Sequence, residues 1–544
     1  MFWQVGDAGQ PLGRYIAFDF IDGKHRRADC PQPQRLGQHP EAERADLGSA
    51  VRPYDLLIVG GGVNGCGIAR DAAGRGLSVK LVEMADLGGA TSSASTKLIH
   101  GGLRYLEHFK FRLVREALQE RTVLLNAMPH IAWPMRFVLP IGPGQRRAGW
   151  MLRLGLFVYD RLGGKGSLPG TRTLKLGADP TGAPLKPEFT KAYEYSDGWV
   201  DDARLVVLNA RDAANNGADI CPRTKLERTG RVDGLWQAEV SGGSVVFVRG
   251  LVNAAGPWVA DVLNARLGAN SAAAVRLVRG SHIVVRQMFA HDKCYFLQQP
   301  DGRIIFAIPY EGAFTLIGTT DSDHDGPKDQ AVCTPEERDY LLEAANRYFA
   351  DPITADDIVW TYSGVRPLYD DGASSASSAT RDYVLEGSDA GGEVPLLSVF
   401  GGKITTYRRL AESALMKLRP FFKNMGPAWT ADAPLPGGEF TASDLPELIK
   451  RLRESNPFLD ESWATRLIRA YGLDAFGMLD GAMTLEAMGQ VFGATLTARE
   501  VDWLCRNEWA RTAEDICWRR SKLGLRMSAA EIEDLQAYLI KQPG

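Results

Sequence analysis

The feature that most constrains the fold is a glycine-rich turn between an apolar run and a helical pattern. Three glycines form the pattern G-x-G-x-x-G: Gly60, Gly62 and Gly65. The apolar run 55–59 precedes them, a helical pattern over 64–75 follows, and a second apolar run over 78–83 ends at Glu83. This order predicts a strand, a helix and a second, parallel strand in one sheet.

The spacing of the three glycines is typical of a phosphate-binding turn. The first permits a tight turn, the second lets backbone amides approach a pyrophosphate, and the third allows the helix to pack closely. The helix N-terminus adds partial positive charge, and Glu83 would accept hydrogen bonds from ribose hydroxyls. The unit therefore predicts a dinucleotide site, without distinguishing FAD from NAD.

The next segment favours a loop that lies against a cofactor. Residues 91–106 read TSSASTKLIHGGLRYL, which brings hydroxyl side chains, two adjacent glycines, a histidine and an arginine close together. Farther along, the β-branched and aromatic runs 282–285, 303–308 and 314–318 predict strands of a mixed or antiparallel sheet. We therefore expect a second domain interleaved with the first.

Composition excludes several functional classes. The net charge of -3 provides no global attraction to nucleic acid. Seven widely spaced cysteines without a C-x-x-C pair argue against a disulfide framework and against a metal site, and they favour a reducing compartment. No stretch approaches the roughly 18 to 20 apolar residues that span a bilayer, and the N-terminus lacks a secretory pattern.

Ten stretches between about residue 54 and residue 525 resemble one enzyme family, and they occur in the family's order. They include VGGGVNGCGIARDAAGRGLSV, ATSSASTKLIHGGLRYLEH, IGTTD, WTYSGVRPL and SVFGGKITTYR. The chain resembles aerobic, FAD-dependent glycerol-3-phosphate dehydrogenase, within the D-amino-acid-oxidase-like flavoproteins. The resemblance implies FAD as cofactor and oxidation of sn-glycerol 3-phosphate to dihydroxyacetone phosphate, with ubiquinone or menaquinone as electron acceptor.

The resemblance also implies a domain organisation. We expect an α/β protein in which a Rossmann-like FAD-binding domain is interleaved with a substrate domain built on a mixed or antiparallel sheet, plus a C-terminal α-helical domain. The expected regions are a poorly ordered extension (1–53), the interleaved pair (54–425), a linker (426–441) and the helical domain (442–544). Within the pair, the FAD parts are about 54–130, 200–265 and 360–420, and the substrate parts about 131–199 and 266–359.

Three arginines match family positions that suit a dianionic phosphate: Arg104, Arg366 and Arg381. A guanidinium group makes bidentate, charge-assisted hydrogen bonds to such a group. We expect Tyr105 and His282 to contribute to the same substrate site. Any one of these arginines, taken without the family match, would more often be a solvated charge.

Three residues compete for the role of proton acceptor. His100 is preferred because its unperturbed pKa lies near neutrality and it precedes Arg104 by four residues. His282 is the rival, and Lys403 could act as base if desolvation lowered its pKa. For Lys403 we favour an electrostatic role, in which it stabilises negative charge on the reduced flavin. His100, Arg366 and Lys403 therefore form the expected catalytic set.

The expected FAD contacts extend beyond the glycine turn. The predicted cofactor-binding residues are Gly60, Gly62, Asn64, Gly65, Glu83, Thr91, Ser92, Ser95, Lys97, Gly101, Gly256, Gly402, Lys403 and Thr405. Gly256 follows the apolar run 246–252 and could also belong to an ordinary turn at the end of a strand. For Asp201, Asp202 and Arg204, in another matching stretch, the expectation is structural ion pairing.

The stretch 146–162 bears on where electrons leave the protein. Its arginines fall mostly on one helical arc, and the other positions are largely apolar, which fits a helix in a lipid interface with Trp150 at headgroup depth. A buried core helix with a charged edge is the competing interpretation. We expect a cytoplasmic protein bound peripherally to the inner face of the membrane, and a homodimer is left open.

Two other functions remain as alternatives. A soluble oxidase of the same substrate would deliver electrons to oxygen and release hydrogen peroxide. A flavin-binding regulatory protein without turnover belongs to a different class, and it is disfavoured because basic and proton-accepting residues occur at every expected position.

Overall fold

The computed structural model describes residues 52–142, 149–163, 168–268, 275–370, 382–388 and 394–542. All of them lie within one compact unit of the chain, Pro33–Pro543. Most of the predicted extension, residues 1–51, lies outside the described residues. No helix in the described part of the chain is long and apolar enough to cross a membrane.

The first sheet is built around the predicted glycine turn. In spatial order its strands are β17 (Val384–Ser388), β18 (Leu396–Phe400), β10 (Ser244–Asn253), β1 (Tyr54–Val59), β2 (Val79–Val82) and β7 (Asp219–Cys221). The five strands from β18 to β7 are parallel, as the predicted unit requires. Strand β17 is antiparallel to β18, and the hairpin of β8 (Leu226–Val232) and β9 (Leu235–Val240) extends β10.

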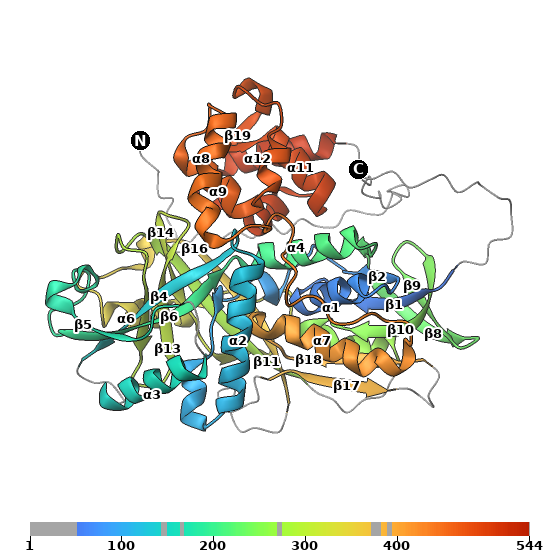
Figure 1. Ribbon diagram of the computed structural model, residues 1–544, viewed down its shortest axis with the longest axis horizontal. Helices are drawn as coiled ribbons and strands as arrows, with labels where there is room; N and C mark the ends of the chain where they lie inside the picture. The colour runs from blue at the N-terminus through green and yellow to red at the C-terminus, as the bar shows by residue number, and fades with distance from the viewer. Residues whose placement is uncertain are drawn as a thin grey trace, which may run out of the picture. The chain divides into compact units, whose positions relative to one another are not determined.

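Helix α1 (Val63–Gly74) is buried along almost its whole length. It packs against α4 (Asp202–Asn215) and α7 (Tyr407–Leu418), which Figure 1 shows beside it. Small residues on α1 permit this approach, since a Cβ at Gly67 would lie 2.7 Å from Cδ2 of Tyr407. The apolar core between the first sheet and these helices includes residues from α1, α4 and α7 and from β1 and β2.

The second sheet is mixed, as predicted. In spatial order its strands are β15 (Ser322–Asp323), β11 (Val275–Arg286), β14 (Phe314–Gly318), β13 (Ile304–Tyr310), β12 (Cys294–Gln298), β4 (Ala132–Ile141), β6 (Lys191–Val200) and β3 (Leu98–Ile99). Strand β16 (Ile358–Tyr369) pairs with β11, and β5 (Arg172–Lys175) pairs with β6. Only β12 and β4 are parallel among these described pairs. The three predicted strands correspond to β11, β13 and β14.

Helices cover the second sheet. Helix α6 (Pro335–Asn346) contributes Leu341 and Ala345 to one apolar cluster on the sheet. Helices α2 (Phe111–Ala127) and α3 (Gly149–Leu162) contribute to a second cluster, which contains Leu118 and Leu156.

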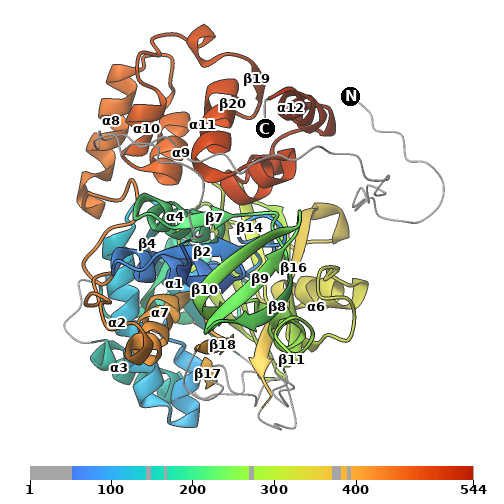
Figure 2. The same ribbon diagram turned by 90° about the vertical axis from the view of Figure 1, so that its right-hand side faces the viewer.

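The C-terminal region forms a helical domain with its own apolar core, as predicted. Its helices are α8 (Leu445–Ser455), α9 (Glu461–Tyr471), α10 (Asp474–Met478), α11 (Ala498–Glu508) and α12 (Ala529–Lys541). Helices α8 to α11 lie side by side in Figure 2. A short hairpin of β19 (Val491–Gly493) and β20 (Leu496–Thr497) also occurs, which the helical pattern did not predict.

Candidate functional site

Close backbone approach explains two glycines of the turn. Gly60 has a φ of +112°, and a Cβ there would lie 2.4 Å from the carbonyl oxygen of Ala254. A Cβ at Gly65 would lie 1.9 Å from the carbonyl oxygen of Gly60. Any side chain at either position would displace backbone, so the tight turn between β1 and α1 requires glycine.

The N-terminus of α1 has no side-chain cap from its own N-cap residue, Gly62. The Val63 amide donates instead to Oγ of Ser92, at 3.0 Å. The first turn carries no acidic residue, so the positive end of the helix dipole is not neutralised from within the helix. This geometry suits an anion, and it places Ser92 at the N-terminus of α1.

Glu83 closes the turn from the neighbouring strand. Its carboxylate accepts from the amides of Gly61, at 2.6 Å, and Ala85, at 2.8 Å. Burial raises the pKa of Glu83, while the two amide bonds act in the opposite direction. Each carboxylate oxygen has a second lone pair, so the predicted ribose contact is compatible with these bonds.

A second pair of adjacent glycines, Gly401 and Gly402, lies between β18 and α7 and contacts the first glycine turn. Asn64 donates through Nδ2 to the carbonyl oxygen of Gly401, at 3.1 Å. Gly402 has a φ of +101°, and a Cβ there would lie 2.9 Å from Nδ2 of Asn64. The Oδ1 atom of Asn64 is buried and has no hydrogen-bond partner among the described residues. An unpaired buried acceptor is costly, so this site fits a bound group that carries a hydrogen-bond donor, as FAD does.

Gly256 lies at a third turn, after β10. It has a φ of +54°, and nothing lies within 4 Å of the position that a Cβ would occupy. Asn253 holds this turn by donating to the carbonyl oxygen of Val259 at 2.8 Å.

Several predicted cofactor residues in the segment 91–97 have protein partners. Thr91 donates to the carbonyl oxygen of Val365 at 2.6 Å. Ser95 and Lys97 both donate to the carboxylate of Asp202, at 2.7 and 2.5 Å. Lys97 is buried, so its ammonium group forms a desolvated ion pair at the start of α4. The expected ion pairing of Asp202 is thereby located, and the cofactor role of Lys97 stays a prediction.

Arg366 projects from β16 toward the end of β14. Its Nη1 donates to Asp321 at 2.6 Å, and its Nη2 donates to Oγ1 of Thr319 at 3.0 Å. The guanidinium group lies so close to β11 that a Cβ at Gly280 would be 2.3 Å from Nη2. These contacts orient the fork of donors while leaving about a quarter of the side chain exposed, at 27%.

His282 is fully buried on β11. Its Nε2 lies 3.0 Å from Oγ1 of Thr96, and its ring stacks on Tyr362 with 4.6 Å between centroids. Burial lowers the pKa of His282 well below its usual value, and the charges of Arg366 and Lys97 lower it further. The imidazole is therefore neutral, and its Nδ1 has no hydrogen-bond partner among the described residues.

The residues around His100 form the other side of the site. The His100 amide donates to Oγ1 of Thr405 at 3.3 Å. The ammonium group of Lys403 lies over the ring of Tyr105, 4.3 Å from its centroid. The Gly101 amide donates to the hydroxyl of Tyr159 at 2.7 Å. The segment that follows the first turn therefore reaches both the α7 glycines and the second sheet.

Two residues to which the sequence analysis gave no role contact the predicted site residues. Asp321 orients Arg366, and Tyr362 stacks on His282. Both belong to stretches that match the family, IGTTD and WTYSGVRPL, which is the signal that could have found them. The side chain of Arg104 and the whole of Arg381 lie outside the described residues.

The glycine turns, the unpaired Oδ1 of Asn64 and the two sheets agree with a known family. A profile described as FAD dependent oxidoreductase matches residues 55–408. The chain belongs to this family. A second profile, described as the C-terminal domain of alpha-glycerophosphate oxidase, matches residues 428–537 of the helical region.

Curated relatives cover nearly the whole chain. The glycerol-3-phosphate dehydrogenase of Pseudomonas aeruginosa is 52% identical over 490 residues, covering 89% of this chain and 95% of the relative. The D-erythritol 1-phosphate dehydrogenase of Brucella abortus is 50% identical over 482 residues, covering 88% and 96%. The structure of the Bacillus halodurans glycerol-3-phosphate dehydrogenase complexed with FAD is similar, with a TM-score of 0.69, 28% identity and coverage of 90% and 89%.

These findings confirm the resemblance and the cofactor. The protein is an FAD-dependent oxidoreductase with the fold of the glycerol-3-phosphate dehydrogenases.

Proposed function

We propose that the protein oxidises sn-glycerol 3-phosphate to dihydroxyacetone phosphate and passes the electrons to a membrane quinone, ubiquinone or menaquinone. When bound, FAD supplies the hydride acceptor. The proposal rests on three side chains: the oriented Arg366, the neutral and buried His282, and Lys403 directly after Gly402. They occur in a chain that is 52% identical to a glycerol-3-phosphate dehydrogenase.

Arg366 is the proposed phosphate ligand. A phosphate needs donors in a fixed fork, and the contacts of Arg366 with Asp321 and Thr319 hold that fork in one orientation. We propose that Arg104, Tyr105, Arg381 and His282 complete the substrate site.

His100 is the proposed base, with His282 as the alternative. A base must be neutral before it accepts the hydroxyl proton, and burial keeps His282 in that state. His282, however, already contacts Thr96 through Nε2 and is fully buried, whereas His100 is only half-buried. The greater access of His100 supports its assignment.

Lys403 has the proposed role of stabilising negative charge that develops on the cofactor. Among the described residues no carboxylate forms an ion pair with Lys403, and its ammonium group lies over the ring of Tyr105. Gly402 immediately precedes it, so the lysine sits where backbone can come close to a bound group.

Helix α3 is the proposed contact with the membrane. Its outer face carries four exposed apolar side chains: Trp150, Met151, Leu154 and Phe157. Trp150 is 69% exposed, which argues against the buried core helix. Arg161 lies over the ring of Phe157, 4.6 Å from its centroid, and can place its charge at headgroup level. Arg146 and Arg147, two arginines of the stretch 146–162, lie outside the described residues.

A second segment adds to this surface. Phe109 is 78% exposed and packs edge-on against Phe111, which is 42% exposed. The short helix Leu103–His108 just before them contacts α3, and both elements lie at the lower edge of Figure 1. Exposed aromatics gathered with basic residues suit a lipid surface, which supports peripheral binding at the inner face of the membrane.

D-Erythritol 1-phosphate is a second candidate substrate, because the relative that acts on it by name is 50% identical. An anaerobic spectrum of the purified protein distinguishes the two. We expect the yellow colour to bleach on adding glycerol 3-phosphate at concentrations far below those needed with D-erythritol 1-phosphate. The reverse order would replace the substrate, and no bleaching with either would favour a protein without turnover.

The electron acceptor is tested in the same samples. After anaerobic reduction by glycerol 3-phosphate, a soluble quinone analogue should restore the yellow colour faster than dissolved oxygen at equal concentration. Fast peroxide formation without quinone activity would establish the oxidase alternative instead.

A further inference from the structure

The segment between β2 and the predicted cofactor hydroxyls lies across the glycine turn. Residues 84–93 follow Glu83 and end with the short helix Thr91–Ser93. The Gly88 amide donates to the carbonyl oxygen of Gly61 at 2.9 Å, and Ser93 donates to the carbonyl oxygen of Gly88 at 2.7 Å. This segment, which we call the cofactor loop, is therefore bonded directly to the phosphate-binding turn.

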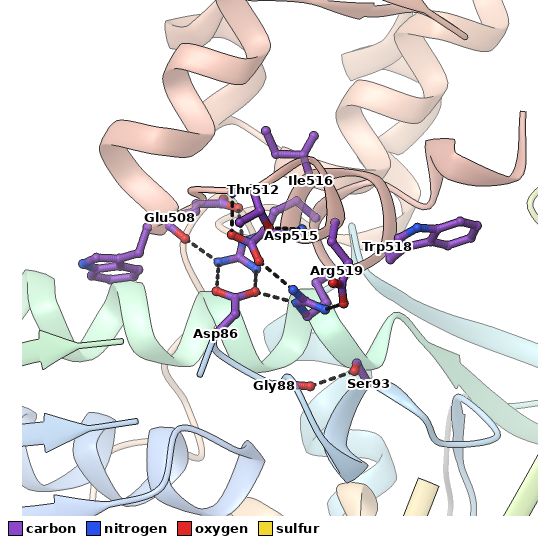
Figure 3. A network of polar contacts seen from close by, with 12 residues as sticks. Asp86, Gly88, Ser93, Glu508, Thr512, Asp515, Ile516, Trp518 and Arg519 are labelled. Atoms are coloured by element: carbon purple, nitrogen blue, oxygen red, sulfur yellow. Dashed lines mark hydrogen bonds and ion pairs between the residues drawn. The ribbon is translucent and has the colours of Figure 1, made fainter. Parts of the chain in front are cut away.

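A buried carboxylate in the cofactor loop is bound by the C-terminal helical domain. Asp86 is 5% exposed and accepts two bonds from Arg520, at 2.6 and 2.9 Å. It accepts a third bond from Nε of Arg519, at 2.6 Å. Figure 3 shows Arg519 beside this carboxylate, which lies two residues before Gly88 in the sequence.

The two arginines are themselves held in place within the C-terminal domain. Arg519 donates to Asp515 at 2.6 Å, and Arg520 donates to the carbonyl oxygen of Glu508 at 2.6 Å. Asp515 also accepts from the backbone amides of Arg511 and Thr512, at 2.8 and 2.9 Å. The donors that face Asp86 are therefore preorganised by α11 and by the turn that follows it.

Separating Asp86 from Arg519 and Arg520 would be costly on both sides, although Arg223 lies 3.9 Å from Asp86 and Glu508 lies 3.9 Å from Arg520. A buried carboxylate without its cations carries a large desolvation penalty, and the same holds for Arg520, which is 1% exposed. The contact that pairs these charges by hydrogen bonds therefore favours the cofactor loop bound to the C-terminal domain. The loop in turn sets the position of Gly88 and Ser93 relative to the glycine turn.

We propose that the C-terminal helical domain clamps the FAD site through Asp86. Arg519 and Arg520 hold the cofactor loop against the glycine turn and thereby strengthen FAD binding. Asp86 is a positioning residue in this proposal, because it acts through the backbone of Gly88 and Gly61. The proposal depends on FAD binding alone, so it stands whichever substrate or electron acceptor the enzyme uses.

A second ion pair between the same two domains provides a matched control. Arg211 on α4 donates to Asp474 of the C-terminal domain at 2.8 Å. It also lies 3.7 Å from Glu508, and neither partner belongs to the cofactor loop. Loss of this pair should weaken the contact between the domains while leaving Asp86 paired.

The test uses the full-length holoenzyme with three substitutions: Asp86→Asn, Arg519→Gln and Arg211→Gln. Ultrafiltration and the fluorescence of released FAD give the FAD dissociation constant. Hydrogen exchange of the peptide that contains residues 84–93 reports on the cofactor loop, and thermal unfolding reports on stability. Arg519→Gln leaves the Arg520 pair with Asp86 intact, so it remains informative if Asp86→Asn fails to fold.

The clamp predicts that Asp86→Asn and Arg519→Gln each weaken FAD binding by about tenfold or more and accelerate exchange in the cofactor loop. Arg211→Gln should change both quantities by less than about twofold, even where it lowers the Tm by a similar amount. Unchanged FAD binding and loop exchange in Asp86→Asn and Arg519→Gln would overturn the proposal. Equal weakening in Arg211→Gln would also overturn it, since a general loss of domain contact would then explain the effect.

Discussion

Replacing Arg366 by alanine should raise the KM for glycerol 3-phosphate by about 10- to 1000-fold. The guanidinium group is oriented by Asp321 and Thr319, so little ordering remains to be done when a phosphate binds. One charge-assisted hydrogen bond is worth ~1.5–3 kcal/mol, and each ~1.4 kcal/mol changes affinity tenfold. A single lost contact gives the lower part of the range, and a bidentate pair gives the upper part.

The Asp321 carboxylate should bring the increase in KM close to the upper end of this range. Without Arg366, Asp321 loses the cation 2.6 Å away and presents an uncompensated negative charge close to the expected phosphate. Arg366→Lys retains the positive charge but loses the fork, so its KM should lie between those of the native enzyme and Arg366→Ala.

The assay is steady-state turnover combined with anaerobic flavin reduction at varied substrate concentration. The matched control is Arg276→Ala, on β11, because Arg276 pairs at 2.8 Å with Asp323, whose side chain is 53% exposed. We expect the control to change KM by less than about twofold. An Arg366→Ala enzyme with native KM would refute the assignment of Arg366 to the phosphate.

Four further predictions concern the base, the cofactor turn, the lipid surface and acid stability. His100→Asn should slow anaerobic flavin reduction far more than it weakens FAD binding in stopped-flow and binding measurements; if only His282→Asn does so, the base is His282. Gly402→Ala should yield protein with little bound FAD, since it puts a Cβ at a φ of +101° and 2.9 Å from a side-chain nitrogen, and full occupancy in the absorption spectrum would contradict this. Trp150→Glu should reduce co-sedimentation with anionic vesicles, and unchanged binding would remove α3 from the interface. Burial lowers the pKa of His130 to about 3, so this histidine binds a proton more tightly in the unfolded chain than in the folded one. The free energy of unfolding is therefore fully present above pH 6.5 and falls as the pH drops toward 3. In urea unfolding, this histidine should lower the free energy of unfolding by ~2 kcal/mol between pH 7 and pH 5. A His130→Asn variant that loses the same free energy over this range would show that His130 is not the cause.

Local sequence was sufficient for the elements whose signal is short-range. The pattern around Gly60, Gly62 and Gly65 predicted β1, α1 and β2 because tight turns and close helix packing admit only glycine at fixed spacings. Alternating and continuous apolar runs likewise predicted strands that became β11, β13 and β14.

Residue patterns were ambiguous where burial depends on distant packing. The stretch 146–162 predicted a helix with apolar positions around much of its circumference. Only the packing of α2 and the second sheet decides that Leu156 and Tyr159 are buried, and that Trp150 is exposed. Helical periodicity describes angles around one axis, and it does not specify which face meets a neighbour.

The sequence by itself determined the family, the FAD-binding turn and the residue types of the site. The tertiary structure alone decided which charges meet: Lys97 with Asp202, and Asp86 with Arg520, 434 positions away. No local pattern encodes such pairs, because an ion pair depends on where two remote backbones place their side chains and on how much water is excluded there. For the same physical reason, the coupling of the C-terminal domain to the cofactor loop became visible only in the folded chain.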